Sequence, residues 1–233
     1  SKMQIIKRYG LDNDRVLIIP FSPSEIIQSK TFDNKNIINI NEKYKLKGDY
    51  LYYPAQFWPH KNHIFILEGI ALLEKQEKIK INVIFSGSDK GNKSYVLDKA
   101  KDLGLQDRIK FVGFVNNEEV PHLYKQSIGL IMPSYFGPTN IPPLEAFKLG
   151  VPVIYSDIPG SEEQIGNAAI KLNLYDIKSF IEAIKIIKNN SAKQKLIENG
   201  YQQLKAINKK RLNSENLFFE SIKKFAITRR CWY

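Results

Sequence analysis

The sequence predicts an α/β fold built on a doubly wound parallel sheet, and three observations support this prediction. From residue 49 onward, short apolar runs alternate with segments of helical spacing, which is the order of strand–helix–strand units. The apolar runs lack a polar–apolar alternation, as expected of strands covered on both faces. With 233 residues, 43% of them hydrophobic, the chain is large enough for one α/β domain with an appendage.

The chain before residue 49 has weaker patterns. We expect a short helix over residues 3–9, stopped by Gly10, and a short strand over residues 15–20. Residues 21–48 contain several turn formers and little periodicity, so we expect a linker or surface loop there.

The alternating region predicts a regular series of elements, with strands as apolar runs and helices as segments with apolar residues three and four apart. Strands are expected over residues 50–55, 81–87, 108–113, 128–134, 151–157 and 168–173. Helices are expected over residues 62–76, 95–104, 117–126 (with an acidic first turn), a segment opening at Pro142, and residues 176–190 and 193–225. Ligands of such sheets bind beyond the carboxyl ends of the strands, so the loops there are expected to carry function.

Composition narrows the class of protein. The net charge of +11 favours anionic partners, which include nucleotides, sugar phosphates, nucleic acid and an anionic membrane surface. The single cysteine, Cys231, cannot form an intramolecular disulfide. The sequence shows no signal peptide, and no apolar run approaches the roughly 18 residues that a membrane span needs. We therefore expect a soluble, cytoplasmic protein.

The segment FGPTNIPPLEAF, residues 136–147, is the strongest candidate site. Gly137 and Asn140 favour a tight turn, and Pro142–Pro143 preset the first turn of a helix. The backbone amides of Thr139–Ile141 and the helix dipole would then face one volume suited to a diphosphate. Glu145, one turn into the helix, can accept two hydrogen bonds from a vicinal diol such as a ribose. On spacing alone, an equal alternative is that Glu145 only offsets the helix dipole.

The segment YPAQFWPHKNH, residues 53–63, also joins a strand to a helix. Lys61 lies in the expected first helical turn, where the dipole disfavours a cation unless an anion shares the site. The alternative is a solvated lysine. His60 and His63 are three residues apart, but neither Cys nor a carboxylate gathers beside them in the sequence, so we expect no metal site.

Two further loops leave alternatives open. FSGSDKGNKSY, residues 85–95, nearly forms a P-loop, but Asn92 stands where that motif has its second glycine. A P-loop-like NTPase is therefore one alternative function. In the loop after the third strand, residues 113–115 would present backbone groups to a flat ring, or form an ordinary turn with an apolar plug. The basic C-terminal helices leave a non-catalytic nucleic-acid-binding module as another alternative, although they show no interleaved aromatic residues.

Taken in order, these segments resemble the carboxy-terminal half of glycosyltransferase family 4, whose enzymes have the GT-B fold of two Rossmann-like domains. Five segments carry the resemblance, over residues 49–174: YPAQFWPHKNH, GSDKGN, LGLQDRIKFVGFV, LYKQSIGLIMPSYFGPTNIPPLEAFKLGVPVIYSD and GNAAI. The resemblance implies that residues 1–20 are a remnant of the end of the N-terminal domain and residues 21–48 a linker. Residues 49–190 would be the Rossmann-like nucleotide-sugar-binding domain, and residues 191–233 the C-terminal helices and tail.

The resemblance also implies roles for residues. Lys61 matches the lysine that binds the donor diphosphate and steadies the leaving group, and Glu145 matches the glutamate that binds the ribose hydroxyls; these two would form the catalytic site. Gln56 stands where many members have an arginine for the phosphates. Gly137 stands where the family has a first glutamate, which meets the donor sugar. The remaining implied contacts are Thr139, Asn140 and Ile141 with the diphosphate and sugar, and Gly87, Ser88, Phe114 and Val115 with the nucleotide.

The implied activity is a retaining glycosyl transfer from a nucleotide diphosphate sugar to an acceptor hydroxyl, in the synthesis of bacterial surface polysaccharide or lipopolysaccharide. No cofactor and no metal are expected. The implied partners are the nucleotide sugar, an acceptor glycan or lipid-linked saccharide, the protein's own N-terminal domain and an anionic membrane surface, but no nucleic acid. A peripheral location on the inner membrane face follows from these. The acceptor would bind mainly to the first domain, so the chain alone would be inactive or weakly active.

Overall fold

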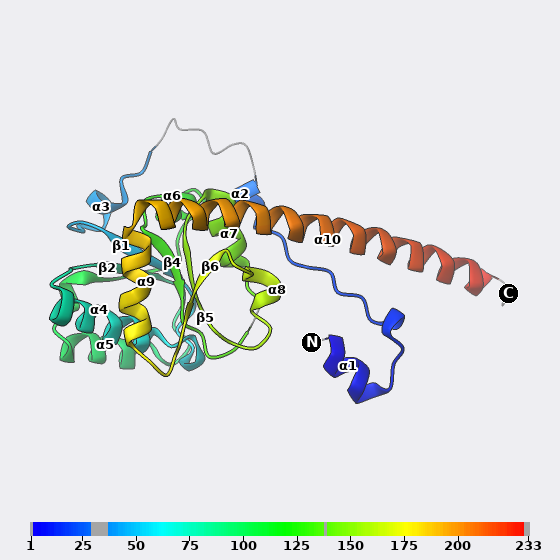
Figure 1. Ribbon diagram of the computed structural model, residues 1–233, viewed down its shortest axis with the longest axis horizontal. Coiled ribbons are helices and arrows are strands. Elements are labelled where there is room, and N and C mark those ends of the chain that lie inside the picture. Colours follow the sequence, from blue (N-terminus) through cyan, green and yellow to red (C-terminus); the bar gives the residue numbers. More distant parts are fainter. Residues whose placement is uncertain (1, 29–36, 138, 231–233) are drawn as a thin grey trace. The chain divides into compact units, whose positions relative to one another are not determined.

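The structure is a computed structural model that describes residues 2–28, 37–137 and 139–230 (Figure 1). The chain divides into two compact units. The larger comprises residues 23–203, and the smaller comprises residues 1–22 together with residues 204–233.

The larger unit is built on a six-stranded sheet in the order β3-β2-β1-β4-β5-β6, in which every neighbouring pair is parallel. The chain proceeds outward from β1 to β3 and then returns to the other side of β1 to add β4, β5 and β6. This confirms the predicted doubly wound parallel sheet. The strands are β1 (Tyr50–Pro54), β2 (Asn82–Ser86), β3 (Ile109–Gly113), β4 (Gly129–Met132), β5 (Val153–Ser156) and β6 (Ala169–Leu172).

Helices cover both faces of this sheet (Figure 1). On one face α4 contacts α5 and α9, and on the other α7 contacts α2 and α6. The helices of the first group are α4 (His63–Glu77), α5 (Lys93–Asp102) and α9 (Lys178–Lys188). Those of the second are α2 (Glu25–Gln28), α6 (Val120–Lys125) and α7 (Ile141–Leu149). Two short helices, α3 (Ile40–Lys43) and α8 (Glu162–Ile165), lie in the connections.

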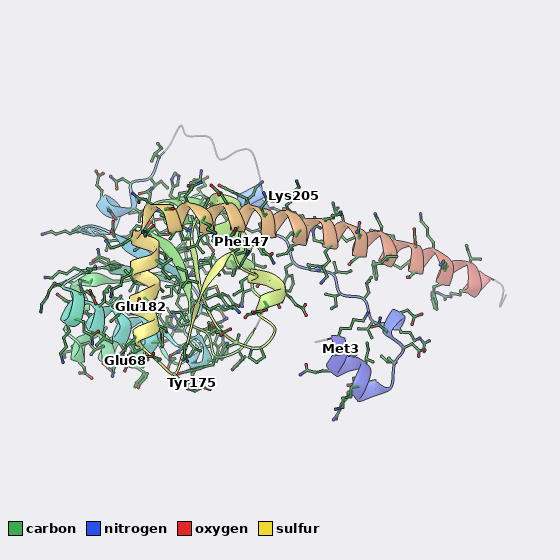
Figure 2. All side chains as sticks on the ribbon, viewed as in Figure 1. Met3, Glu68, Phe147, Tyr175, Glu182 and Lys205 are labelled. Atoms are coloured by element: carbon green, nitrogen blue, oxygen red, sulfur yellow. The ribbon has the colours of Figure 1, made fainter. Side chains whose placement is uncertain are left out.

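The core lies between the sheet and these helices. Every residue of β2, β4 and β5 is buried, which explains why their sequences show no polar–apolar alternation. Polar side chains instead mark the outer faces of the helices, as Glu68 on α4 and Glu182 on α9 show (Figure 2). Buried tyrosines keep their hydroxyls paired: that of Tyr50 donates to the carbonyl oxygen of Leu123 at 2.9 Å.

The smaller unit contains α1 (Lys2–Tyr9), a 3-10 turn η1 (Asn13–Arg15) and the end of α10 (Asn190–Arg230), which begins in the larger unit. Large apolar side chains are exposed along this end of α10: Leu212, Leu217, Phe218, Phe219, Ile222, Phe225 and Ile227. In the described part of the chain, every helix is too short or too polar to cross a membrane.

Two expectations about individual elements are wrong. Residues 15–20 form no strand: Arg15 ends η1, residues 16–20 follow it as extended chain, and Leu17, Ile18 and Ile19 are each about 40% exposed. A strand needs a neighbour to bond with, and none of the described residues pairs with this run. The expected acidic first turn of α6 lies before the helix, because Glu119 is its N-terminal flanking residue.

The buried carboxylate of Glu119 instead has two partners. It accepts hydrogen bonds from the ammonium of Lys43 at 2.6 Å and the hydroxyl of Tyr44 at 2.7 Å, which attach α3 and the residue after it to the start of α6.

Candidate functional site

The candidate site lies where the strand order reverses, at the carboxyl ends of β1 and β4. Open α/β sheets bind ligands at this position because the loops after the two strands diverge from it. Here the two loops are held together. The backbone N–H of Tyr135 donates to the carbonyl oxygen of His60 at 2.9 Å, and the hydroxyl of Tyr53 in β1 lies 3.2 Å from the hydroxyl of Ser134 in the loop after β4.

Lys61 precedes helix α4 instead of lying in its first turn. Residues Pro59–Lys61 form a 3-10 turn, η2, and Asn62 then adopts a left-handed conformation (φ 54°) before α4 begins at His63. The ammonium of Lys61 forms no ion pair with any residue that the structure describes. Partial burial lowers the pKa of Lys61, because an unpaired cation is disfavoured away from water. An anionic ligand would remove this penalty.

Gly137 and Asn140 are held in place by hydrogen bonds. The side-chain amide of Asn140 donates to the carbonyl oxygen of Gly137 at 2.6 Å, and the hydroxyl of Tyr155 donates to the same oxygen at 3.0 Å. Gly137 has φ 91°, which favours glycine over any residue with a side chain. The loop conformation therefore accounts for the glycine at a position where the resemblance implies a glutamate.

Gln164 in α8 holds Asn140 from the other side. The side-chain oxygen of Gln164 accepts the backbone N–H of Asn140 at 2.8 Å, and its amide donates to the carbonyl oxygen of Asn140 at 2.6 Å. The expectation that the amides of residues 139–141 are all available to a ligand is therefore wrong for Asn140. Thr139, two residues before α7, and Ile141, its first residue, remain, and both residues are exposed.

Glu145 is buried, and both of its carboxylate oxygens have partners within the protein. One accepts a hydrogen bond from the hydroxyl of Ser24 at 2.5 Å, and the other from the hydroxyl of Tyr124 at 2.8 Å. Burial, and then the neighbouring charge of Glu145, raise the pKa of Tyr124 well above its usual value, so Tyr124 stays protonated and donates. Each oxygen keeps a further lone pair, so the carboxylate is oriented but still able to accept hydrogen bonds.

The loops after β1, β2 and β3 meet through backbone contacts. Gly87 has φ 139°, and a Cβ atom there would lie 2.6 Å from the carbonyl oxygen of Ala55. Its N–H donates to the carbonyl oxygen of Gly113 at 2.8 Å, and Ser88 accepts the N–H of Phe57 at 3.0 Å. Only a glycine fits this close approach.

The loop after β3 carries the two residues expected to meet the base. The ring of Phe114 is 91% exposed, whereas Val115 is half-buried. Phe114 therefore offers a free aromatic face to a flat ligand, and the alternative of an apolar plug does not fit its exposure.

The geometry does not favour the P-loop alternative. The carboxylate of Asp89 accepts the backbone N–H groups of Gly91 at 2.8 Å and Lys93 at 3.2 Å, at the start of α5. These bonds lower the pKa of Asp89. A P-loop uses such amides to cradle phosphate, but here a negative side chain occupies them and would repel a phosphate.

The two histidines have different surroundings. His63 is fully buried and stacks on Phe57, with ring centroids 4.4 Å apart, whereas His60 lies on the surface loop. Among the residues that the structure describes, no three His, Cys, Asp or Glu side chains gather closely enough to hold a metal ion.

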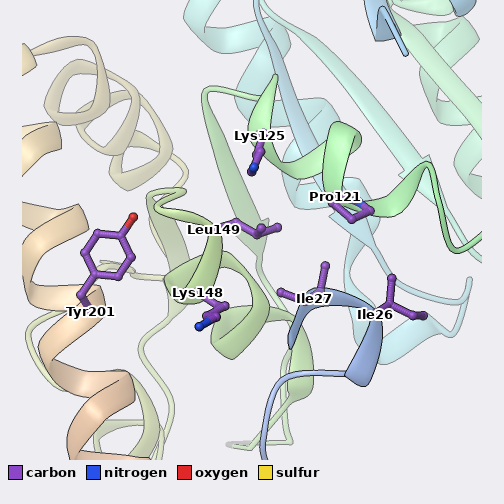
Figure 3. A pocket seen from close by; sticks show the side chains of 7 residues that line it. All are labelled: Ile26, Ile27, Pro121, Lys125, Lys148, Leu149 and Tyr201. Atoms are coloured by element: carbon purple, nitrogen blue, oxygen red, sulfur yellow. The ribbon is translucent and has the colours of Figure 1, made fainter. Parts of the chain in front are cut away.

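A separate pocket of about 270 Å³ lies at the C-terminal ends of α6 and α7, at the other end of these helices from the loops above (Figure 3). Lys125 and Lys148 contribute its charge. Both occupy the last turns of their helices, where the dipole favours a cation. The positions of these lysines at helix ends therefore explain their presence, and no ligand is needed to explain it.

The sequence identified the loops of the site, but it missed Ser24, Tyr124, Tyr155 and Gln164. These residues orient Glu145 and Asn140 from positions 15 to 121 residues away in the chain. Their residue types are common and no local spacing marks them.

Known proteins resemble this chain in sequence. The family model of glycosyl transferases group 1 matches residues 33–203. The O-antigen chain mannosyltransferase RfbU of Salmonella typhimurium is 31% identical over 192 residues, which cover 80% of this chain and 48% of that protein. The O-antigen chain mannosyltransferase B of Escherichia coli is 27% identical over 188 residues, which cover 76% and 46%. The chain thus spans about half the length of these curated relatives.

Solved structures show the same fold. WaaG, a glycosyltransferase involved in lipopolysaccharide biosynthesis, aligns with a TM-score of 0.71 at 20% identity, over 87% of this chain and 55% of WaaG. Anabaena HepE in complex with UDP and glucose aligns with a TM-score of 0.74 at 15% identity, over 96% of this chain and 61% of HepE. At these identities the likeness shows the fold alone, and it confirms the Rossmann-like domain of GT-B glycosyltransferases.

Proposed function

Because the chain belongs to the glycosyl transferases group 1 family, we propose that it binds a nucleotide diphosphate sugar and takes part in transferring the sugar to an acceptor hydroxyl. The observation that carries the proposal is Lys61, a partly buried cation without a carboxylate partner among the described residues, placed where the strand order reverses. The family indicates the class of reaction, and Lys61 indicates where the donor diphosphate would bind.

The diphosphate would lie between Lys61 and the start of α7. Negative charge grows on the leaving diphosphate as the bond to the sugar breaks, and Lys61 is placed to stabilise it. The backbone N–H of Ile141, the first residue of α7, lies at the favourable end of the helix dipole, and that of Thr139 comes two residues before the helix. One such preorganised donor contributes about 3 kcal/mol to transition-state stabilisation in other enzymes.

The nucleoside would extend from this point toward the loops after β2 and β3. The carboxylate of Glu145, oriented by Ser24 and Tyr124, can accept the ribose hydroxyls with its remaining lone pairs. Gly87 and Ser88 would lie beside the nucleotide, and Phe114 with Val115 would meet the base. The exposed ring of Phe114 supports stacking.

Several finer features belong to the same proposal. The reaction proceeds with retention at the anomeric carbon and without a bound metal. The names of the O-antigen mannosyltransferases support a hexosyl donor and a role in surface polysaccharide synthesis. The acceptor is a glycan or lipid-linked saccharide, and the net charge of +11 supports work at the inner membrane face.

The curated relatives are about twice as long as the chain. Part of the acceptor site would lie in the additional length, so the chain alone binds donor and turns over little.

A thermal-shift panel of UDP, GDP, ADP, dTDP and ATP, with and without magnesium, tests the proposal. One nucleoside diphosphate at a hundred times its Kd should add about 2.7 kcal/mol to the free energy of unfolding, a Tm increase of roughly 5–10 °C. The increase should not need magnesium. Lys61→Ala should abolish it, whereas Lys178→Ala, at an exposed lysine outside the site, should retain it.

Two results would contradict the proposal. One is a panel without any diphosphate response. The other is a magnesium-dependent response to ATP that persists in Lys61→Ala and is lost in Lys93→Ala, which would favour the P-loop alternative.

A further inference from the structure

Three aromatic rings form a stack at the outer edge of the candidate site. Trp58 and His60 belong to the loop after β1, and Phe136 to the loop after β4. The rings of His60 and Phe136 are 4.2 Å apart at 19°, and those of Trp58 and His60 are 6.4 Å apart at 25°. Each neighbouring pair of rings is thus within 25° of parallel, and the imidazole of His60 adjoins both Trp58 and Phe136.

The stack is fixed by hydrogen bonds from both loops. The backbone N–H of Tyr135 donates to the carbonyl oxygen of His60 at 2.9 Å, so the two loops cannot separate freely. The indole N–H of Trp58 donates to the side-chain oxygen of Gln56 at 3.0 Å. An arginine at position 56 has no acceptor for this bond. The glutamine therefore has a role that the implied arginine would lack.

Two rings of the stack, those of Trp58 and Phe136, are apolar and exposed. Phe136 is 60% exposed and Trp58 is 41% exposed, and a patch of exposed apolar rings is a more informative sign of a binding surface than a single exposed residue. Lys90 lies 5.9 Å from the centre of the Trp58 ring, so Phe136 has the more open face. Phe136 also adjoins Gly137, which offers no side chain to a sugar.

We propose that the outer face of Phe136, backed by His60 and Trp58, is a stacking surface for the apolar face of a hexopyranose ring. A pyranose has C–H groups on one face and hydroxyls around its rim, so it fits a flat exposed aromatic ring beside polar groups. The inference rests on the proposed function for the identity of the reaction. The ring can come from the donor's hexose or from an acceptor saccharide, because a hexopyranose in either one presents such an apolar face.

Binding measurements on the 233-residue chain test the stacking surface. The probes are the best nucleoside diphosphate of the panel, its hexose derivative and a free mannose oligosaccharide. Phe136→Ala should leave the affinity for the diphosphate within twofold and weaken one sugar-containing probe about 3- to 10-fold. Phe136→Tyr should restore it. Tyr175→Ala, at a fully exposed ring outside the site, should change none of the three.

The three probes distinguish a donor sugar from an acceptor sugar. They also distinguish a failure of this inference from a failure of the proposed function. A loss confined to the hexose derivative assigns the surface to the donor, and a loss confined to the oligosaccharide assigns it to the acceptor. An equal loss for the diphosphate and its hexose derivative, or no loss for either sugar probe, overturns the inference. If no diphosphate binds the unmodified chain, the proposed function fails, and the oligosaccharide measurement alone still decides the stacking surface.

Discussion

At the scale of single residues, the site depends on side chains held in fixed orientations by partners from distant parts of the chain. The motif residues Lys61 and Glu145 could be selected from the sequence because their loops have a characteristic order. The hydroxyls that orient Glu145 could not, because Ser24 lies 121 residues away and Tyr124 lies 21 residues away. Local spacing predicts where a carboxylate lies, whereas its orientation depends on the folded sheet.

Gly137 gives the first residue-scale prediction. Its φ of 91° is disfavoured for any residue with a Cβ atom, although the space around it is open. Gly137→Glu should therefore lower the free energy of unfolding by about 1–2 kcal/mol, without restoring the sugar contact that the resemblance implies. Chemical denaturation measures the change. Gly137→Ala should cost the same, since the strain belongs to the backbone. A Glu variant as stable as the unmodified chain would show that the loop has another conformation available.

His63 gives a prediction about pH. It is fully buried in an aromatic cluster, and burial lowers its pKa from 6.5 to about 3. Between these values the unfolded chain binds a proton that the folded protein does not. The free energy of unfolding should thus decrease as pH falls from 6.5 toward 3, by up to about 1.4 kcal/mol per pH unit from this group. His63→Phe should have a flatter dependence in urea titrations over this range. An identical slope in the variant would contradict the prediction.

At the scale of elements, the regular strands and helices were predictable and the short irregular ones were not. The six strands occur in the predicted order because each is a distinct apolar run that pairs with a neighbouring strand in the sheet. The run at residues 15–20 is equally apolar, but it has no neighbour in the described chain and forms no strand. Helix α8 has four residues, too few for a periodic pattern, yet it carries the glutamine that fixes the loop before α7.

A substitution of Gln164 therefore tests whether α8 holds the loop before α7. Gln164→Ala removes both hydrogen bonds to the backbone of Asn140, and leaving these partly buried groups unpaired should cost about 1–3 kcal/mol. Nucleoside diphosphate binding should also weaken, since the start of α7 loses its support. The side chain of Gln164→Glu can still accept the N–H of Asn140. Its stability and its affinity for the diphosphate should therefore lie between those of the unmodified chain and those of Gln164→Ala. Gln202→Ala, at an exposed position of α10, is the matched control. Unchanged binding in Gln164→Ala would show that the loop keeps its shape unaided.

At the scale of the whole molecule, the candidate site and the sheet belong to one of two compact units. The larger unit, residues 23–203, contains all six strands and every residue proposed to contact the donor. The grouping of residues 1–22 with residues 204–233 was not predictable from the sequence, because nothing in either segment's pattern identifies the other. The domain boundaries after residues 20, 48 and 190, which the family resemblance implies, remain predictions.

The division into units predicts that residues 23–203 fold and bind donor without the rest of the chain. This fragment begins one residue before Ser24, so it keeps the hydroxyl that donates to Glu145. It should unfold cooperatively in circular dichroism, since its core lies between its own sheet and helices. It should also rank the nucleoside diphosphates as the 233-residue chain does, because Lys61, Phe114 and Glu145 are all retained. A fragment that is folded but has a different ranking would show that the smaller unit contributes to the site. An unfolded fragment would show that the larger unit needs the smaller one for stability, and would contradict the prediction.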